Sequence, residues 1–165
     1  MYSAFDHMNK KQPTLQLTEP MAALKAMTPE ARDSIPHDSL MEQDMITISQ
    51  LPFKVGRESR VRNIEGKQVK TERSKLGDRG PNNNLYLIDI CRPLHISREH
   101  FQIEIDSSGY ILIDRGSACG TAVGTTTIGG HDSGGGARLN DGDIIAVGAK
   151  DTPYLFKFVV LENQS

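Results

Sequence analysis

Short runs in which apolar and polar side chains alternate dominate the chain beyond its first quarter. Phe101, Ile103 and Ile105 are separated by single polar residues, which places their side chains on one face of an extended strand. The turn-forming run 107–109 (Ser-Ser-Gly) follows, and a second β-type run covers 110–113. Two such runs across a glycine-containing turn predict a β-hairpin.

Similar strand-length segments recur along the rest of this region, separated by breaks rich in glycine or aspartate. They cover 46–49, 53–55, 85–90, 122–123, 127–128, 144–147 and 154–161. No sustained helical periodicity interrupts them. Many short strands without alternating helices predict an all-β fold, either an antiparallel sandwich or a barrel.

Residues 1–44 have a different character. They contain four prolines, seven acidic and four basic side chains, and no sustained alternation. Thr18 is a candidate cap for a short helix that includes Leu24, and Thr28 followed by Pro29 is a second helix start signal. We therefore expect a partly helical or disordered tail over 1–44, one domain over 45–163 and a short C-terminal end at 164–165.

Composition excludes several classes of protein. The 165 residues carry 19 basic and 21 acidic side chains, a net charge of −2, which does not suit a general binder of nucleic acid. The two cysteines, Cys91 and Cys119, are too few for a disulfide framework, and no apolar run is long enough to span a membrane. The N-terminal residues lack the pattern of a secretory signal. These features predict a soluble protein of the reducing cytoplasm with no membrane or nucleic-acid partner.

The small net charge conceals a basic segment. Residues 57–79 hold eight basic and four acidic side chains, and few apolar ones. This composition predicts a long solvated loop. We also expect the loop to lie near a binding site for an anion and to attract acidic ligands over a distance.

Four separated motifs occur in a fixed order along the predicted domain. They are Gly56-Arg57, Ser97-Arg98-Glu99-His100, the segment 114–121 (Asp-Arg-Gly-Ser-Ala-Cys-Gly-Thr) and the segment 139–148 that contains Asn-Asp-Gly-Asp. Each motif alone is weak, but their order and spacing resemble the forkhead-associated (FHA) domain family over 45–163. The resemblance implies an FHA/SMAD-like antiparallel β-sandwich of about eleven strands, with phosphothreonine peptides bound by loops at one end.

The resemblance also implies roles for individual residues. A phosphothreonine group presents nearly two negative charges and three acceptor oxygens, which suit a guanidinium and neutral donors. Arg57 matches the arginine that pairs with the phosphate, Ser97 the serine that donates to it, and Arg98 a neighbouring contact. The remaining residues expected at the peptide are Ser117, Ala118, Cys119 and Thr121. Gly56, His100 and Gly120 are expected to support the site.

The chain departs from the family pattern at Cys119. The family usually has an asparagine there, whose side chain binds the peptide main chain, whereas a thiol is a poor donor and a poor acceptor. Losing one such hydrogen bond costs on the order of 1 kcal/mol of binding free energy. We therefore expect phosphate binding to persist with a weaker hold on the peptide.

Other interpretations remain open. A nucleophilic turn at 116–120 with His100 as its base would indicate an enzyme, but such turns normally precede a helix. A metal site formed by Cys91, His95 and Cys119 lacks the ligand spacing of a closed zinc site. The basic loop has no aromatic side chains for stacking on nucleic acid. The strongest alternative is an FHA-like scaffold or self-association domain that no longer depends on phosphate.

The sequence thus predicts a phosphothreonine-dependent interaction module, functionally linked to a Ser/Thr protein kinase. It predicts no enzymatic activity, no cofactor and no metal. Thr14, Thr18 and Thr28 lie in the acidic tail, and their phosphorylation would create a ligand for this domain or for a neighbouring copy.

Overall fold

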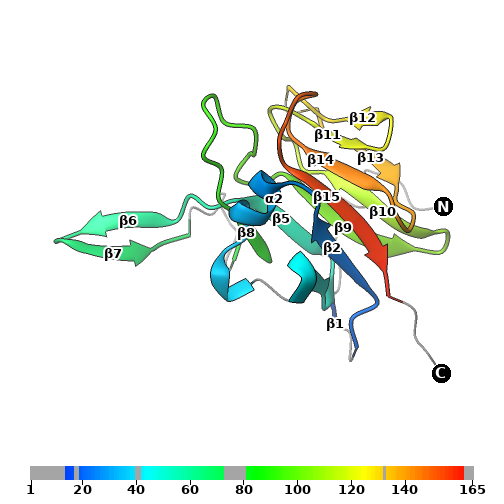
Figure 1. Ribbon diagram of the computed structural model, residues 1–165, viewed down its shortest axis with the longest axis horizontal. Helices are drawn as coiled ribbons and strands as arrows, with labels where there is room; N and C mark the ends of the chain where they lie inside the picture. The colour runs from blue at the N-terminus through cyan, green and yellow to red at the C-terminus, as the bar shows by residue number, and fades with distance from the viewer. Residues whose placement is uncertain (1–13, 17–18, 40–41, 73–80, 132, 162–165) are drawn as a thin grey trace.

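The computed structural model describes residues 14–16, 19–39, 42–72, 81–131 and 133–161. Two β-sheets pack face to face in this part of the chain, and a hairpin projects from one side (Figure 1). Together the two sheets contain eleven strands, and the only α-helix among the described residues is one short segment. The predicted all-β sandwich is confirmed. No helix in the described ranges has the length and apolar character that crossing a membrane requires.

The first sheet has five strands in the order β13-β10-β9-β5-β8, and only β5 and β8 run parallel. Its strands are β5 (Phe53–Arg57), β8 (Leu85–Leu87), β9 (Phe101–Asp106), β10 (Gly109–Asp114) and β13 (Gly135–Arg138). The hairpin predicted from the alternating runs is β9 and β10, with Phe101 opposite Asp114.

The second sheet has six strands, all antiparallel, in the order β12-β11-β14-β15-β2-β3. Its strands are β2 (Ala22–Ala26), β3 (Met45–Ile48), β11 (Thr121–Val123), β12 (Thr126–Ile128), β14 (Ile144–Val147) and β15 (Leu155–Val160). The smaller elements are β1 (Leu15–Gln16) paired with β4 (Gln50–Leu51), α2 (Pro29–Ser34), η1 (His37–Ser39) and η2 (Glu42–Asp44).

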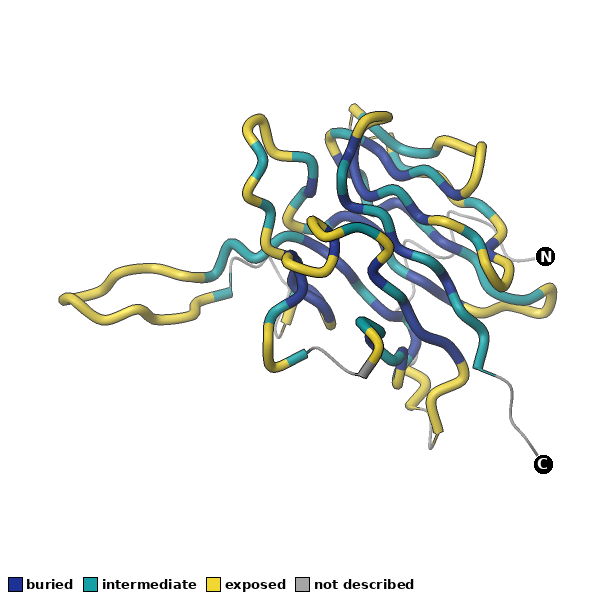
Figure 2. The backbone as a smooth tube through the Cα atoms, viewed as in Figure 1, coloured by how far each residue is buried: buried dark blue, intermediate teal, exposed yellow. Residues whose placement is uncertain are grey.

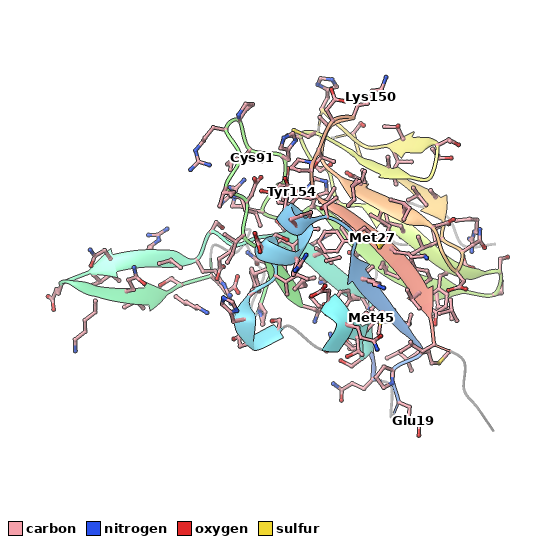
Figure 3. The ribbon with its side chains drawn as sticks, in the orientation of Figure 1. Glu19, Met27, Met45, Cys91, Lys150 and Tyr154 are labelled. Atoms are coloured by element: carbon pink, nitrogen blue, oxygen red, sulfur yellow. The ribbon has the colours of Figure 1, made fainter. Side chains whose placement is uncertain are left out.

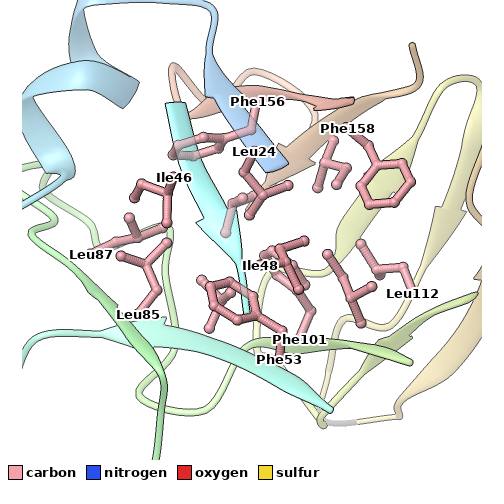
Figure 4. Close-up of a cluster of buried hydrophobic side chains, with 14 of the residues drawn as sticks. Leu24, Ile46, Ile48, Phe53, Leu85, Leu87, Phe101, Leu112, Phe156 and Phe158 are labelled. Carbon is pink, nitrogen blue, oxygen red and sulfur yellow. The ribbon is translucent and has the colours of Figure 1, made fainter. Parts of the chain in front are cut away.

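The core lies between the sheets, where the inward-facing side chains of both meet (Figure 4). Phe101, Ile103 and Leu112 come from the first sheet, and Phe156 and Phe158 come from the second; all are at most 1% exposed. The tube coloured by burial shows the buried residues on the facing strands and the exposed ones in the connections (Figure 2). Burial of these large side chains is the main favourable term in the stability of the sandwich.

Residues 22–26 correct the prediction of a tail over 1–44. They form β2, which lies between β15 and β3 and completes the second sheet. The expected helix through Leu24 is wrong: Leu24 faces the core and is 1% exposed. Alanine has a high helix propensity and hides the period-two pattern, so pairing with two neighbouring strands overrides local preference. The predicted boundary at residue 45 therefore falls inside the sheet.

The second helix start signal in this segment is confirmed. Thr28 caps α2, since its side-chain oxygen accepts a hydrogen bond of 3.1 Å from the backbone N–H of Ala31, and Pro29 occupies the first turn. The Thr28 hydroxyl also donates to the carbonyl of Pro153, which joins the start of the helix to the connection before β15.

The basic segment is also more ordered than a solvated loop. Residues 61–64 and 67–70 pair as β6 (Val61–Ile64) and β7 (Lys67–Lys70), and this hairpin projects from the sandwich (Figures 1 and 2). Its turn residues, Glu65 and Gly66, both have positive φ, as a two-residue type I′ turn requires. Arg73, Lys75 and Arg79 of the same basic segment lie outside the described residues.

Substitution of Leu24 tests whether β2 is part of the core. Leu24→Ala should lower the free energy of unfolding by about 2–5 kcal/mol, because it leaves a cavity between the sheets. Met21→Ala is the control, since Met21 is 43% exposed and its change should stay within about 0.5 kcal/mol. Urea unfolding measures both, and equal small effects would contradict the placement of β2.

Candidate functional site

Several connections meet at the end of the sandwich where β5 finishes. The backbone N–H of Arg57 donates to the carbonyl of Ser97 at 2.9 Å, which ties the end of β5 to the connection between β8 and β9. On the other side, the N–H of Gly148 donates to the carbonyl of Gly120 at 3.0 Å. Together with the bond between His100 and Gly120, they bring the first three motifs and Gly148 of the fourth to this end, while residues 140–143 lie at the opposite end of β14.

Arg57 is the last residue of β5 and its side chain is half-buried. Its guanidinium donates from Nη1 to the carbonyl oxygen of Ile96 at 2.8 Å. The guanidinium is planar, so this bond fixes its orientation beside the 96–98 segment. The structure thus places the sequence-predicted arginine next to the sequence-predicted serine.

Ser97 connects two loops through its hydroxyl oxygen. The oxygen accepts a hydrogen bond of 3.0 Å from the backbone N–H of Ala118. Within the described residues, no hydrogen bond is assigned to the hydroxyl as a donor. A hydroxyl that accepts from the backbone still carries its own proton, so Ser97 can donate to a ligand oxygen while it holds the 118 loop in place. Ala118 is exposed at the tip of that loop.

His100 is completely buried beneath these loops. Its Nδ1 accepts from the N–H of Ser97 at 2.9 Å, so Nε2 carries the proton and donates to the carbonyl of Gly120 at 2.8 Å. Burial lowers the pKa of His100, opposed by the bond to Gly120 and by the charge of Asp114. A neutral ring with both nitrogens bonded to the backbone connects the two loops and has no free nitrogen to serve as a base for Cys119.

The turn that follows β10 is built around the buried carboxylate of Asp114. Oδ1 accepts the backbone N–H groups of Gly116 at 2.9 Å and Ser117 at 2.8 Å. Oδ2 accepts the hydroxyls of Ser117 at 2.6 Å and Thr121 at 2.8 Å. The Ser117 oxygen in turn accepts the N–H of Gly120 at 3.0 Å, which closes the turn.

This network corrects the roles expected of Ser117 and Thr121. Both side chains are 0% exposed and their hydroxyls donate to Asp114, so they shape the turn from below and do not reach its surface. Asp114 belongs to the third motif, but no role was predicted for it. Its position three residues before a serine in a glycine-containing turn could have indicated this role, because the carboxylate of an aspartate commonly accepts backbone N–H groups in turns.

Gly56 allows β5 to approach the 97–99 segment closely. A Cβ at this position would lie 2.0 Å from the carbonyl oxygen of Arg98 and 2.7 Å from Nδ2 of Asn83. Asn83 is buried and donates to that same carbonyl at 2.8 Å. Only glycine therefore fits at position 56. The side chain of Arg98 points away from this contact and is exposed.

Asn83 and Arg115 are supporting residues that the sequence analysis missed. Arg115 donates to Oδ1 of Asn83 at 2.6 Å and to Oε1 of Glu99 at 3.0 Å. Together they fasten the 97–99 segment to the chain entering β8. Arg115 belongs to the third motif, but neither role could be predicted from the sequence, because the contacts join segments that are distant in the chain.

Asp89 organises the outer part of the β8–β9 connection. Its Oδ2 accepts the N–H groups of His95 at 2.7 Å and Ile96 at 2.8 Å, and its Oδ1 accepts the N–H of Cys91 and the hydroxyl of Tyr154. Burial raises the pKa of Asp89, but these hydrogen bonds outweigh it and the net shift is downward. Cys91 and Tyr154 lie at this end of the sandwich (Figure 3).

Cys119 is half-buried, and its Sγ lies 3.6 Å from the carbonyl oxygen of Leu94. The His95 ring packs edge-on against Tyr154, with a centroid distance of 6.2 Å. Among the described residues, no group of three or more His, Cys, Asp or Glu side chains is placed to hold a metal ion. Cys91 and His95 both lie beside Asp89 and Tyr154, whereas Cys119 lies against the carbonyl of Leu94.

Part of the chain matches a known domain family. The FHA domain family model matches residues 73–148, which include the Ser97, Asp114 and Asn140-Asp141-Gly142-Asp143 motifs. This chain contains an FHA domain. The resemblance expected from the sequence is confirmed, and FHA domains are in general interaction modules without enzymatic activity that bind phosphorylated peptides.

A solved structure is similar over almost the whole chain. The solution structure of the FHA domain of an Arabidopsis thaliana hypothetical protein superposes with a TM-score of 0.52, at 21% sequence identity, covering 94% of this chain and 98% of that one. This similarity concerns the fold. The comparison with curated protein sequences gave no match.

The family match begins after Arg57, so the first sequence motif lies outside it. The structure brings Arg57 to the matched region through its hydrogen bonds to Ser97 and Ile96. Strands β2, β3 and β5 also precede the matched residues and complete both sheets of the FHA sandwich.

The buried His100 gives a prediction on pH. Its pKa in the folded chain is below the ordinary value of 6.5, so between these two values the unfolded chain binds a proton that the folded chain does not. The stability contributed by neutral His100 is therefore complete above about pH 6.5 and decreases as the pH falls, by at most about 1.4 kcal/mol per pH unit.

Urea unfolding between about pH 5 and 7.5 measures this slope. His100→Gln should lower the stability at every pH and flatten the slope, because the titrating group is gone. His37→Gln is the control, since His37 is exposed and its removal should leave the slope unchanged. An undiminished slope in His100→Gln would show that another group causes it.

Proposed function

We propose that this FHA domain binds protein segments that contain phosphothreonine, with the phosphate contacted by Arg57 and Ser97. The observation that supports this most strongly is the placement of a half-buried guanidinium beside a hydroxyl that is held by the backbone of the neighbouring loop. A phosphate dianion needs such a combination of a planar cation and neutral donors. Because a buried network positions the loops, the donors require little reordering when a ligand binds.

The other exposed groups at this end extend the proposed site. Arg98 presents its side chain next to Ser97, and Ala118 forms the tip of the adjoining loop. We propose that Arg98 contacts the phosphate or the peptide backbone, and that Ala118 and Cys119 border the peptide. Gly56, His100 and Gly120 support the site through the backbone contacts described above.

In this proposal the domain serves signalling by a Ser/Thr protein kinase, which supplies the phosphorylated partner. We place it in the cytoplasm, where its two free cysteines remain reduced. Neither a nucleic acid nor a membrane is the proposed partner. Phosphorylation of Thr14, Thr18 or Thr28, which would create such a ligand, remains a prediction, and mass spectrometry of the cellular protein tests whether any of these threonines is modified.

Replacement of Arg57 tests the phosphate contact. Arg57→Ala should weaken binding of a phosphothreonine peptide by about tenfold or more, because charge-assisted hydrogen bonds contribute about 1.5–3 kcal/mol each. Arg32→Ala is the matched control, since Arg32 is an exposed arginine on α2. Isothermal titration with phosphothreonine, phosphoserine and unmodified peptides of one sequence measures the effect.

The peptide panel also separates the two candidate functions. Binding selective for phosphothreonine and lost in Arg57→Ala supports the proposal. Equal binding of modified and unmodified peptides would support the scaffold alternative, which the thiol of Cys119 favours because it provides no strong hydrogen bond to a peptide main chain. Unfolding of each variant should be measured alongside, since Arg57 also binds the carbonyl of Ile96.

Cys119→Asn tests the departure from the family pattern. The amide should restore a side-chain hydrogen bond to the peptide main chain and raise the affinity several-fold, equivalent to about 1 kcal/mol. Cys91→Ser is the control, because Cys91 belongs to the Asp89 network away from the Ala118 loop. An unchanged or lower affinity in Cys119→Asn would mean that the thiol position does not face the peptide.

A further inference from the structure

The β6–β7 hairpin exposes three large aliphatic side chains. All eight of its strand residues are exposed, including Val61 at 49%, Ile64 at 50% and Val69 at 39%. A two-stranded hairpin without a sheet or helix behind it is only marginally stable in water. Something must hold it in place, and its aliphatic side chains lack a cover within the described part of the chain.

A cluster of four side chains fixes the base of the hairpin. The Arg60 guanidinium stacks over the ring of Tyr86 at 3.5 Å from the centroid and makes two hydrogen bonds to the Glu58 carboxylate, at 2.7 and 2.8 Å. Glu72 accepts the hydroxyl of Tyr86 and lies 3.6 Å from Nη1 of Arg60. The hydrogen bond from Arg60 lowers the pKa of Glu58, so this pair stays charged at neutral pH.

This base cluster joins the two ends of the hairpin to β8. The N–H of Thr71 donates to the carbonyl of Arg60 at 2.9 Å, which extends the pairing of β6 and β7 down to the cluster. Tyr86 belongs to β8, the edge strand of the first sheet. The hairpin, which we call the arm, is therefore attached at its base to the edge of the first sheet.

The pairing register gives the two faces of the arm different chemistry. Opposite residues of an antiparallel pair share a face, so Arg62, Ile64, Lys67 and Val69 lie together on what we call the Ile64 face. Val61, Asn63, Gln68 and Lys70 form the Asn63 face. The Ile64 face thus has two aliphatic and two cationic side chains, and neither Arg62 nor Lys67 has an ion pair among the described residues.

We propose that the Ile64 face binds an acidic and aliphatic segment of the same phosphoprotein whose phosphothreonine occupies the Arg57 site. This inference rests on the proposed function and extends it. A ligand in which carboxylates alternate with aliphatic residues suits this face. Its carboxylates would pair with the two cations, and its aliphatic side chains would bury apolar surface against Ile64 and Val69. The turn residue Glu65 is the one acidic side chain between Val61 and Lys70.

The location of the arm makes simultaneous binding possible. β6 begins at Val61, four residues after Arg57, and the strand is about 13 Å long. The Ile64 face therefore lies at most about 25 Å from Arg57, a distance that about eight extended residues span. A second contact at this spacing raises the affinity through a high effective concentration.

Synthetic peptides provide the probe. A core phosphothreonine peptide is compared with versions extended by Glu-Leu-Glu-Val after a spacer of about four residues, on its N-terminal or its C-terminal side. The reference extension is Ser-Gly-Ser-Gly. We expect one of the two acidic extensions to increase the affinity of the wild type about tenfold over the core peptide, measured by fluorescence anisotropy.

Two double variants isolate the face. Lys67→Gln with Val69→Thr changes the Ile64 face, and Lys70→Gln with Val61→Thr makes the same chemical changes on the Asn63 face. Both remove one positive charge, so long-range attraction falls equally in the two. We expect the first pair to remove most of the gain from the acidic extension and the second pair to keep it, while the two variants bind the core peptide equally.

The outcomes are distinguishable. No gain from either extension, or an equal loss in both double variants, overturns the inference; the equal loss would indicate only the long-range attraction expected of the basic segment. Failure of the core phosphopeptide to bind the wild type overturns the proposed function and this inference with it. Thermal unfolding of the variants should match the wild type, because all four residues are exposed.

Discussion

The buried carboxylate of Asp114 is the constraint on which the binding end of this domain depends. It accepts two backbone N–H groups and two hydroxyls from the turn that follows β10. A charge buried this deeply is tolerated only when its oxygens are bonded, and here the bonds also determine the path of the chain. With the turn fixed, the N–H of Ala118 reaches Ser97 and the carbonyl of Gly120 reaches His100.

The same principle recurs in the neighbouring connection, where Asp89 gathers three backbone N–H groups and the hydroxyl of Tyr154. At this end, two carboxylates thus accept backbone N–H groups that would be paired with carbonyl groups in a helix or a sheet. Neutral His100 joins the two loops from below, and a charged ring there would have no acceptor for a second N–H at Nδ1. The result is a prearranged surface on which a guanidinium, a hydroxyl and a loop tip meet.

The hairpin arm follows a different rule. All eight of its strand residues are exposed, and its position depends on the cluster of Glu58, Arg60, Glu72 and Tyr86 at its base. Partial burial of this cluster strengthens its charge interactions relative to those of exposed pairs. The family match over 73–148 begins after the hairpin, as it does after β2, β3 and β5.

Local pattern alone determined most of the sandwich. The alternation over 101–113, the strand-length apolar runs and the order of the motifs were sufficient to predict the sandwich and the FHA family. The strand and turn signals are local in the sequence. Alternation between neighbouring residues indicates the two faces of a strand, and two or three residues that include a glycine indicate a turn.

Only the tertiary structure decided the parts that depend on distant partners. The alanine-rich segment 22–26 became a strand because β15 and β3 lie on either side of it, and the basic segment became a hairpin because Tyr86 holds its base. The hydroxyls of Ser117 and Thr121 face inward because they donate to the carboxylate of Asp114. Asn83 and Arg115 hold the loop that contains Ser97. Such choices are set by which polar groups find partners and which surfaces are covered after the sheets pack, and a single stretch of sequence does not contain that information.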